Sequence, residues 1–365
     1  MRRSMSFRPI VWSWLIAALA IGCAASPSRL QPRALNLQAS GVEALGRGEL
    51  DRAAGAFALA LEFEPRLAEA ENGLGLVAVK RGDWMRAEER FRAALALNED
   101  LAEAHLNLAS TLIHRAATSD ALIEARAALA IDPGYGDARL LTAELLLRVG
   151  RLDEARWEVE KLCAAAPERA DAHAANALVL ARLGRTAAAE DEARRALALD
   201  AKLPAAHRAR AEILRRAGDL AAASEELEVV IAADPGSIDD RLAHATVAAA
   251  RGLWSQAAHE LEELVAAAPR QAEVLFAAAY VALAQGDPQA ALRGADAALA
   301  LRAQYPEARL VRAEALARLG RDREMRRELE AFLLQAPSTM TAERDRAERA
   351  LRARPALLPA VIGIQ

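Results

Sequence analysis

A small residue recurs in this chain every 34 residues, and this period limits the possible folds more than any other feature of the sequence. The recurring residue is glycine in every repeat except one, in which Ala116 takes its place. The glycines are Gly48, Gly82, Gly150, Gly184, Gly218, Gly252, Gly286 and Gly320. Nine repeats therefore run without insertion or deletion from residue 34 to residue 339. Such a period indicates small units that must stack on one another, because a single unit cannot bury its apolar face alone.

Three further positions of the repeat show what each unit contains. Seven residues before the recurring glycine stands Gly or Ala, and five residues after it stands Ala in every repeat but the last, which has Met325. Proline tends to close the unit, at Pro65, Pro133, Pro167, Pro235, Pro269 and Pro337. Small residues allow two helices to pack closely, glycine supplies a positive φ at the turn between them, and proline ends the second helix. Each repeat is therefore predicted to be a pair of antiparallel helices.

The composition agrees with an all-α protein. Apolar residues make up 53% of the chain but aromatic residues only 4%, so the apolar content is mainly Ala and Leu, both strong helix formers. The formal net charge is −4, with acidic and basic residues intermixed. A nucleic-acid-binding protein usually has a basic excess or a basic stripe, so we expect no nucleic-acid partner.

The repeat resembles the tetratricopeptide repeat (TPR), whose 34-residue pattern has a small residue at position 8, Ala at 20, an aromatic at 24 and Pro at 32. The first repeat matches through Gly41, Ala53, Phe57, Ala60 and Pro65, and the second through Gly75, Ala87, Phe91 and Ala94. The Trp of position 4 is replaced throughout, for example by Leu37, His105, His173 and His207. The resemblance implies a right-handed α-solenoid of nine helix-turn-helix units, a fold that hosts many functions.

The tripeptide Arg81-Gly82-Asp83 spells an adhesion motif. It falls at the recurring glycine, where other repeats read RGELD, VGRLD, AGDLA and RGLWS. We therefore interpret it as the turn between the two helices of the second repeat.

Residues 1–22 have the layout of a lipoprotein signal peptide: three arginines, a short apolar run and small residues before Cys23. The sequence Leu19-Ala20-Ile21-Gly22-Cys23 resembles a bacterial lipobox, which implies that Cys23 is lipidated and that residues 23–33 link the anchor to the repeats. Ala24 after the cysteine favours the outer membrane, by analogy with enterobacterial sorting. The alternative is an ordinary cleaved signal and a secreted or periplasmic protein.

The end of the chain lies outside the repeats. Residues 340–354 read as a polar-faced helix that would cap the last apolar face of the array. Residues 355–365 form an apolar tail, too short to span a bilayer and broken by Pro355 and Pro359. The tail could fold back onto the array or dock on a partner.

The sequence contains no phosphate-binding loop, paired cysteines or nucleophile elbow, so we expect no enzyme, no cofactor and no small-molecule substrate. His105, His173 and His207 share position 4, but equivalent residues of stacked repeats should lie about 10 Å apart, too far for one metal ion. We therefore expect no metal site. Cys163 is interpreted as a small apolar residue rather than a nucleophile.

In TPR proteins the concave surface is lined by the first helix of each unit, at positions 2, 5, 9, 12 and 13. Mapped onto this chain, these positions offer a basic cluster followed by two aromatic residues. The predicted groove residues are Arg148, Arg182, Arg208, Glu212, Arg215, Arg216, Phe276 and Tyr280. Such a groove could hold a peptide or helix with an acidic part and an apolar anchor, and Arg215→Glu and Tyr280→Ala should each weaken its capture. Alternatively, the arginines only solvate the groove and the aromatic residues pack between helices.

One subtype is excluded by its motif. TPR domains that bind chaperone C-terminal carboxylates carry Lys and Asn at positions 5 and 9 of their first repeat, where this chain has Gln38 and Val42. The resemblance to pilus-assembly lipoproteins favours a lipid-anchored, periplasm-facing scaffold that assists assembly of an envelope machine, such as a pilus, a secretion complex or an outer-membrane-protein complex. The alternative is a component of exopolysaccharide synthesis or export.

Overall fold

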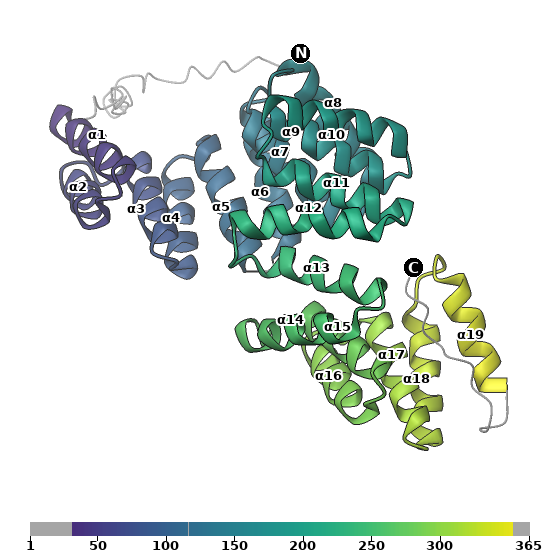
Figure 1. Cartoon of the computed structure of the whole chain (residues 1–365). Helices are drawn as coiled ribbons and strands as arrows, with labels where there is room; N and C mark the ends of the chain where they lie inside the picture. The colour runs from purple at the N-terminus through teal and green to yellow at the C-terminus, as the bar shows by residue number, and fades with distance from the viewer. Residues whose placement is uncertain (1–30, 116, 353–365) are drawn as a thin grey trace, which may run out of the picture. The chain divides into compact units, whose positions relative to one another are not determined.

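A computed structural model describes residues 31–115 and 117–352, and all of its regular structure is helical in these ranges (Figure 1). The helices form nine consecutive pairs followed by one last helix. They are α1 (Pro32–Gly46), α2 (Leu50–Phe63), α3 (Ala68–Lys80), α4 (Trp84–Leu97), α5 (Ala102–His114), α6 (Thr118–Ile131), α7 (Gly136–Arg148), α8 (Leu152–Ala165), α9 (Ala170–Arg182), α10 (Thr186–Leu199), α11 (Pro204–Ala217), α12 (Leu220–Ala233), α13 (Ile238–Ala250), α14 (Trp254–Ala267), α15 (Ala272–Ala284), α16 (Pro288–Leu301), α17 (Pro306–Arg318), α18 (Asp322–Gln335) and α19 (Thr341–Arg352). The predicted all-α fold with nine helical pairs is confirmed.

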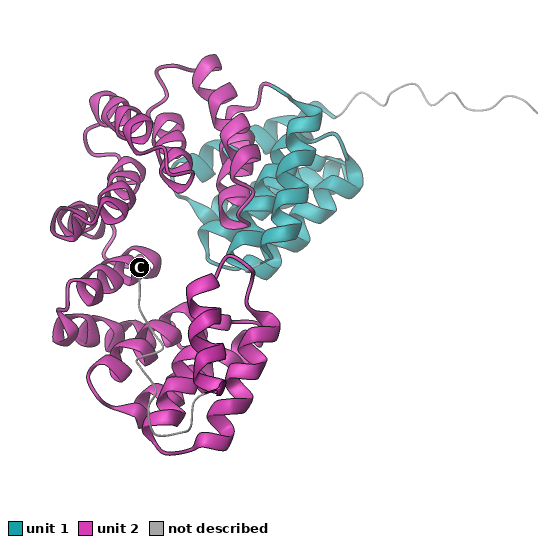
Figure 2. Cartoon of the chain, turned by 90° about the vertical axis from the view of Figure 1, so that its right-hand side faces the viewer, with its two compact units in different colours: residues 1–133 teal, residues 134–365 magenta. Residues whose placement is uncertain are grey.

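The chain divides into two compact units, residues 1–133 and 134–365, which we call unit 1 and unit 2 (Figure 2). Within each unit the two helices of a repeat pack against each other, and the second helix packs against the next repeat. First helices also contact one another, as α1 and α3 do in unit 1, and α9 and α11 or α15 and α17 do in unit 2. We call the layer formed by the first helices of unit 2 its inner layer. No helix in the described part of the chain is both long and apolar enough to cross a membrane.

The turn of the second repeat shows how glycine ends the first helix of a pair. Gly82 has φ of 73°, a left-handed conformation that is strained for residues with a Cβ atom. The Asp83 side chain then accepts a hydrogen bond of 3.1 Å from the backbone N–H of Arg86 and so caps α4. Arg81-Gly82-Asp83 is therefore a structural turn, as predicted.

The position-24 phenylalanines of the first two repeats, Phe57 and Phe91, are buried where glycine leaves room for their rings. A Cβ atom on Gly75 would lie 2.4 Å from the Phe91 ring, and one on Gly41 or Gly73 would lie within 2.6 Å of the Phe57 ring. Both phenylalanines are fully buried, and burial of such a ring stabilises a fold by about 1.5–3 kcal/mol. Later repeats have Ala at position 8 and a smaller residue at position 24, so the combined volume stays similar.

A polar pair takes the place of the position-4 Trp in most repeats. Position 4 pairs with the residue 19 places later in the second helix of the same repeat. The pairs are Glu71–Arg90 (3.0 Å), His105–Glu124 (2.6 Å), Arg139–Glu158 (2.6 Å), His173–Glu192 (2.6 Å), His207–Glu226 (2.7 Å), Arg241–Glu260 (3.8 Å) and Arg309–Glu328 (3.0 Å). Repeats 1 and 8 lack charge at both places, with Leu37 and Ala56, and Leu275 and Gly294. The two positions therefore change together within the chain, as contacting residues do.

The position-4 side chain also joins consecutive repeats. The Nε2 atom of His173 lies 2.9 Å from the carbonyl oxygen of Pro167, the closing residue of the preceding repeat. The same bond recurs from His105 to Glu99 (3.0 Å) and from Arg309 to Ala303 (3.1 Å). Each such residue satisfies a carbonyl at the end of one helix pair and a carboxylate in the next, so it holds two repeats in register.

The last helix, α19, covers the apolar face that α18 would otherwise expose. Ala347 and Ala350 pack into one buried cluster with Leu329 and Phe332. The Arg344 guanidinium donates hydrogen bonds to the carbonyl oxygens at the end of α18, at 2.8 and 2.9 Å. The predicted capping helix is confirmed. The predicted signal peptide, Cys23 and the apolar tail at 355–365 lie outside the described residues.

Candidate functional site

Four of the predicted groove residues lie together in the inner layer of unit 2, with three arginines around the carboxylate of Glu212. Glu212 on α11 accepts hydrogen bonds from Arg215 (2.8 Å) and Arg216 (2.7 Å) on the same helix, and Arg182 on α9 lies 3.3 Å away. Burial alone would raise the pKa of Glu212, but these hydrogen bonds and the charge of Arg182 hold it below its usual value. We call these four residues the Glu212 cluster. Its positive charge is already partly neutralised within the protein.

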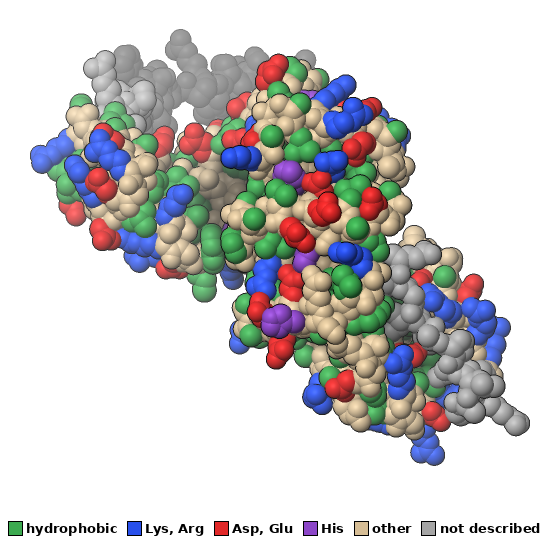
Figure 3. Space-filling model, viewed as in Figure 1, with side chains coloured by type: hydrophobic (Ala, Val, Ile, Leu, Met, Phe, Trp, Pro, Cys, Tyr) green, Lys and Arg blue, Asp and Glu red, His purple; other side chains and the backbone are tan. Residues whose placement is uncertain are grey.

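The other two predicted arginines lie outside that cluster, Arg208 on α11 and Arg148 on α7. Arg208 donates two hydrogen bonds, of 2.6 and 2.8 Å, to the buried carboxylate of Asp240 on α13. Arg148 is exposed at the end of α7, one turn after Glu144. On the face shown in Figure 3, acidic and basic side chains likewise lie next to one another.

Phe276 and Tyr280, the two predicted aromatic residues, line a cavity of about 470 Å³ between α13, α15, α17 and the start of α19. Most of its wall is apolar. The lining residues are Leu242, Ala245, Thr246, Ala249, Leu261, Glu273, Phe276, Ala277, Tyr280, Val281, Tyr305, Glu307, Leu310, Val311, Met340 and Glu343. We call this cavity the aromatic pocket. Its volume and apolar lining are those of a site for a small molecule or a few side chains of a peptide.

Ring contacts hold the aromatic side chains of the pocket in place. Phe276 packs against Tyr305 with ring centroids 5.1 Å apart, and Tyr280 packs against Trp254 at 6.2 Å. Burial raises the pKa of both Tyr280 and Tyr305. The phenol groups therefore stay neutral, and Tyr280 presents a hydrogen-bonding hydroxyl on an apolar wall.

Three carboxylates, those of Glu273, Glu307 and Glu343, lie among the lining residues. Glu273 pairs with Arg302, and Glu343 pairs with Arg346 at 2.9 Å. Glu307 is exposed and makes no ion pair with any residue of the described ranges. The pocket thus combines an apolar interior with an acidic group able to meet a cation.

Sequence comparison identifies the family of the chain. One tetratricopeptide-repeat family model matches residues 72–136, 174–238 and 242–306, more than half of the chain, and a second matches residues 118–179. The chain is a tetratricopeptide-repeat protein. A comparison with curated proteins finds no match to it.

Solved structures are similar to this TPR protein in fold. The APC/C hetero-tetramer Cut9-Hcn1 matches with a TM-score of 0.62 and 17% identity, over 90% of this chain and 71% of that one. A tetratricopeptide repeat protein from Parabacteroides merdae ATCC 43184 matches with a TM-score of 0.52 and 18% identity, over 68% of this chain and 98% of that one. PilW, a type IV pilus biogenesis factor, matches with a TM-score of 0.45 and 22% identity, over 57% and 96%. At these identities the likeness shows the fold alone.

Sequence reasoning found two residues of the TPR protein's pocket and missed most of the others. Leu242, Thr246 and Leu310 stand at the same inner positions, 5 and 9, as Phe276 and Tyr280. The position rule that selected the aromatic residues would therefore have selected them as well. Met340 and Glu343 follow the last repeat, so no repeat position could have pointed to them.

One hydrogen-bonded chain in the TPR protein has the order of groups found in a serine hydrolase. The Ser224 hydroxyl lies 3.1 Å from His244 Nε2, and His244 Nδ1 lies 2.9 Å from Glu260. However, Ser224 is only 2% exposed, so its hydroxyl is closed to a substrate. The hydrogen bond to Glu260 also raises the pKa of His244. The three residues therefore serve the packing of repeats 6 and 7.

Proposed function

We propose that this TPR protein is a non-enzymatic scaffold that holds a protein partner in the aromatic pocket of repeats 7 to 9. The observation that supports the proposal is the pocket itself: a cavity on the inner layer, lined by Phe276, Tyr280 and Tyr305. Tyrosine and phenylalanine in a well-packed depression are typical binding anchors, because they bury a large area at a small cost in side-chain entropy.

The pocket suits an apolar segment of a partner, either a helix or an extended peptide. A basic residue next to that segment could pair with Glu307. The Glu212 cluster lies on α9 and α11 of the same inner layer, and Arg215 and Arg216 there remain partly exposed. We propose it as a secondary contact, for an acidic part of the same partner. No nucleic acid, cofactor or small-molecule substrate enters the proposal.

We further propose that the scaffold is anchored in the outer membrane by lipid on Cys23 and faces the periplasm. There it would assist assembly of a pilus, a secretion complex or an outer-membrane-protein complex. Support for this part comes from residues 1–24 of the sequence: the arginines, the short apolar run and the lipobox-like ending. A Cys23→Ser variant tests it, because it should leave the membrane fraction; a variant that stays there contradicts the anchor.

A photoreactive amino acid at Tyr280, activated in the native cell, tests the binding proposal. The matched control carries the same amino acid at His259, an exposed residue of α14. A protein adduct at 280 that is absent at 259, identified by mass spectrometry, supports the scaffold. Thr246→Trp should prevent that adduct, since the exposed Thr246 lines the pocket. Equal adducts at both positions, or none at either, would contradict a protein partner in the pocket.

A further inference from the structure

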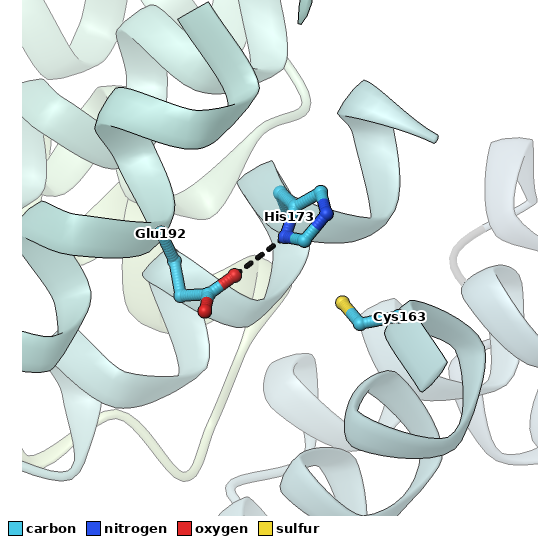
Figure 4. Close-up of side chains that lie close together, drawn as sticks. All are labelled: Cys163, His173 and Glu192. Atoms are coloured by element: carbon cyan, nitrogen blue, oxygen red, sulfur yellow. Dashed lines mark hydrogen bonds and ion pairs between the residues drawn. The ribbon is translucent and has the colours of Figure 1, made fainter. Parts of the chain in front are cut away.

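We propose that Cys163, His173 and Glu192 form a binding site for one zinc-type divalent metal ion at the junction of repeats 4 and 5. The three side chains come from the consecutive helices α8, α9 and α10 and converge (Figure 4). One ligand atom from each, a sulfur, an imidazole nitrogen and a carboxylate oxygen, lies within 4.8 Å of the other two. This set differs from the three position-4 histidines, each of which has its own glutamate.

The hydrogen bonds of His173 leave Nδ1 as the ring atom that can bind the ion. Nε2 lies 2.9 Å from the Pro167 carbonyl oxygen, and a carbonyl only accepts, so Nε2 carries a hydrogen. Nδ1 lies 2.6 Å from Glu192 Oε2, and a proton must sit between these two atoms. A divalent ion can replace that proton, and the Pro167 carbonyl then orients the ring as a supporting hydrogen bond does in metal sites.

The chain contains its own comparison for this site. Repeats 3 and 6 repeat the His–Glu pair and the carbonyl bond, in His105–Glu124 and His207–Glu226. Ten residues before those histidines, where Cys163 stands relative to His173, the sequence has Leu95 and Leu197. Every other repeat has Leu, Ile or Val there: Leu61, Leu129, Ile231, Val265, Leu299 and Leu333. The thiol of Cys163 is thus the feature that distinguishes the His173–Glu192 pair from the His–Glu pairs of repeats 3 and 6.

The surroundings leave the ligand atoms available to an ion. Cys163 is half-buried, and the side chain of Glu192 is 14% exposed. Arg195 pairs with Oε1 of Glu192 at 3.0 Å, which leaves Oε2 for the ion. A Cys, a His and a carboxylate suit Zn²⁺, which often takes a water as its fourth ligand. On binding, the thiol proton and the proton shared by His173 and Glu192 pass to the solvent.

Metal titration of the purified full chain tests the proposal, with Co²⁺ as the spectroscopic probe and Zn²⁺ as its competitor. A Cys23→Ser background leaves Cys163 as the only thiol. We expect one Co²⁺ per chain, with a sulfur-to-cobalt charge-transfer band in the near ultraviolet that one equivalent of Zn²⁺ abolishes. Cys163→Leu should lose the band and keep its helical circular dichroism, because leucine is the usual residue at this position of the repeat.

A gain-of-function variant separates ligation from damage to the fold. Leu197→Cys places a thiol beside His207 and Glu226 by the repeat register, so it should bind a second Co²⁺ and roughly double the band. A band that survives Cys163→Leu, or the absence of stoichiometric Co²⁺ and Zn²⁺ binding by the parent chain, would overturn the site. A Leu197→Cys variant with only one ion would show that the His–Glu–Cys geometry is insufficient and would also contradict the proposal.

Discussion

Two stretches of the same inner layer, both in unit 2, differ in their side chains: one carries charged groups that pair with one another, and the other carries apolar groups that line a cavity. On α9 and α11, three arginines surround Glu212, and Arg208 is held by Asp240. On α13, α15 and α17, aromatic and aliphatic side chains leave a cavity of about 470 Å³. The family pattern assigns the lining of both stretches to the same repeat positions.

The difference concerns what remains for a partner to bind. A charged group that already has an internal counter-ion gives a partner little, because the partner must compete with that ion and lose its own hydration. An apolar cavity has no such competitor, and filling it removes apolar surface from water. We therefore place the main binding energy at the aromatic pocket and expect the Glu212 cluster to influence specificity. Each of the following predictions tests one side of this contrast.

Deletion of residues 340–365 should have the largest effect, because it removes both the cap and one wall of the pocket. Leu329 and Phe332 lose the cover of Ala347 and Ala350, and Met340 and Glu343 leave the pocket. Exposed apolar faces of this kind cause association, so we expect aggregates in size-exclusion chromatography with light scattering. A soluble monomer with unchanged thermal stability would show that α19 is not a cap.

Tyr280→Ala should weaken capture of the crosslinked partner by about 2 kcal/mol, roughly 30-fold in Kd, since anchors in packed pockets carry most of the binding energy. The matched variant is Arg215→Glu on the charged stretch. Because Arg215 is partly exposed and already bonded to Glu212, its reversal should cost only about threefold. Isothermal titration with both variants gives the comparison directly. A larger loss for Arg215→Glu than for Tyr280→Ala would reverse the assignment of the two stretches.

The sequence predicted the fold almost completely because the repeat restates each constraint nine times. The turn at Gly82 and the small residues at position 8 follow from local chemistry that recurs in register. The cap at α19 follows from the apolar face that a repeat array leaves open at its end. The polar pairs were also present in the sequence, since residues such as His173 and Glu192 change together at a spacing of 19. The replacement of Trp at position 4 was visible in the sequence, but the contact between the two positions required the structure, because a spacing does not show which atoms meet.

The candidate site was less predictable, for two physical reasons. Arg215 and Arg216 read as free positive charge in the sequence, whereas the structure turns both onto Glu212, a distinction that depends on rotamers. Met340 joins the pocket because of the angle at which the cap docks, and no repeat position sets that angle. Cys163 approaches His173 and Glu192 because the end of one repeat packs on the start of the next.

Glu212→Gln should destabilise the protein by about 1 kcal/mol at neutral pH, because it removes a carboxylate that accepts charged hydrogen bonds; the partial exposure of the arginines limits the effect. The folded-state pKa of Glu212 is lowered, so its stabilising contribution is present above the usual pKa of a glutamate and is lost as the pH falls through the folded pKa. Urea unfolding of the variant and the parent should therefore differ at neutral pH and converge in acid. A constant difference across this range would mean that the cluster does not hold Glu212 ionised.

Replacement of His244, in the stretch that carries the aromatic pocket, should have the smallest effect. His244 is a buried residue of α13, the helix whose Leu242, Ala245, Thr246 and Ala249 line the pocket. It faces Ser224, Glu260, Glu228 and Arg251, and its pKa is raised, chiefly by the hydrogen bond to Glu260. A raised folded-state pKa means that the charged form stabilises the fold. This contribution is complete below the usual pKa of histidine and is lost as the pH rises through the folded value.

As the pH rises from about 6 to about 8, the melting temperature of the parent should therefore fall further than that of His244→Gln, by a few degrees at most. Glutamine keeps polar groups at this place but does not titrate. Glu260→Gln is the control for the cause, because it removes the main partner of the imidazolium and should flatten the profile in the same way. Parallel melting curves for the parent and His244→Gln would show that His244 does not titrate in this range. The ion pairs of repeat 7 would then contribute equally to stability at both ends of this pH range. The Ser224–His244–Glu260 chain would act through packing alone.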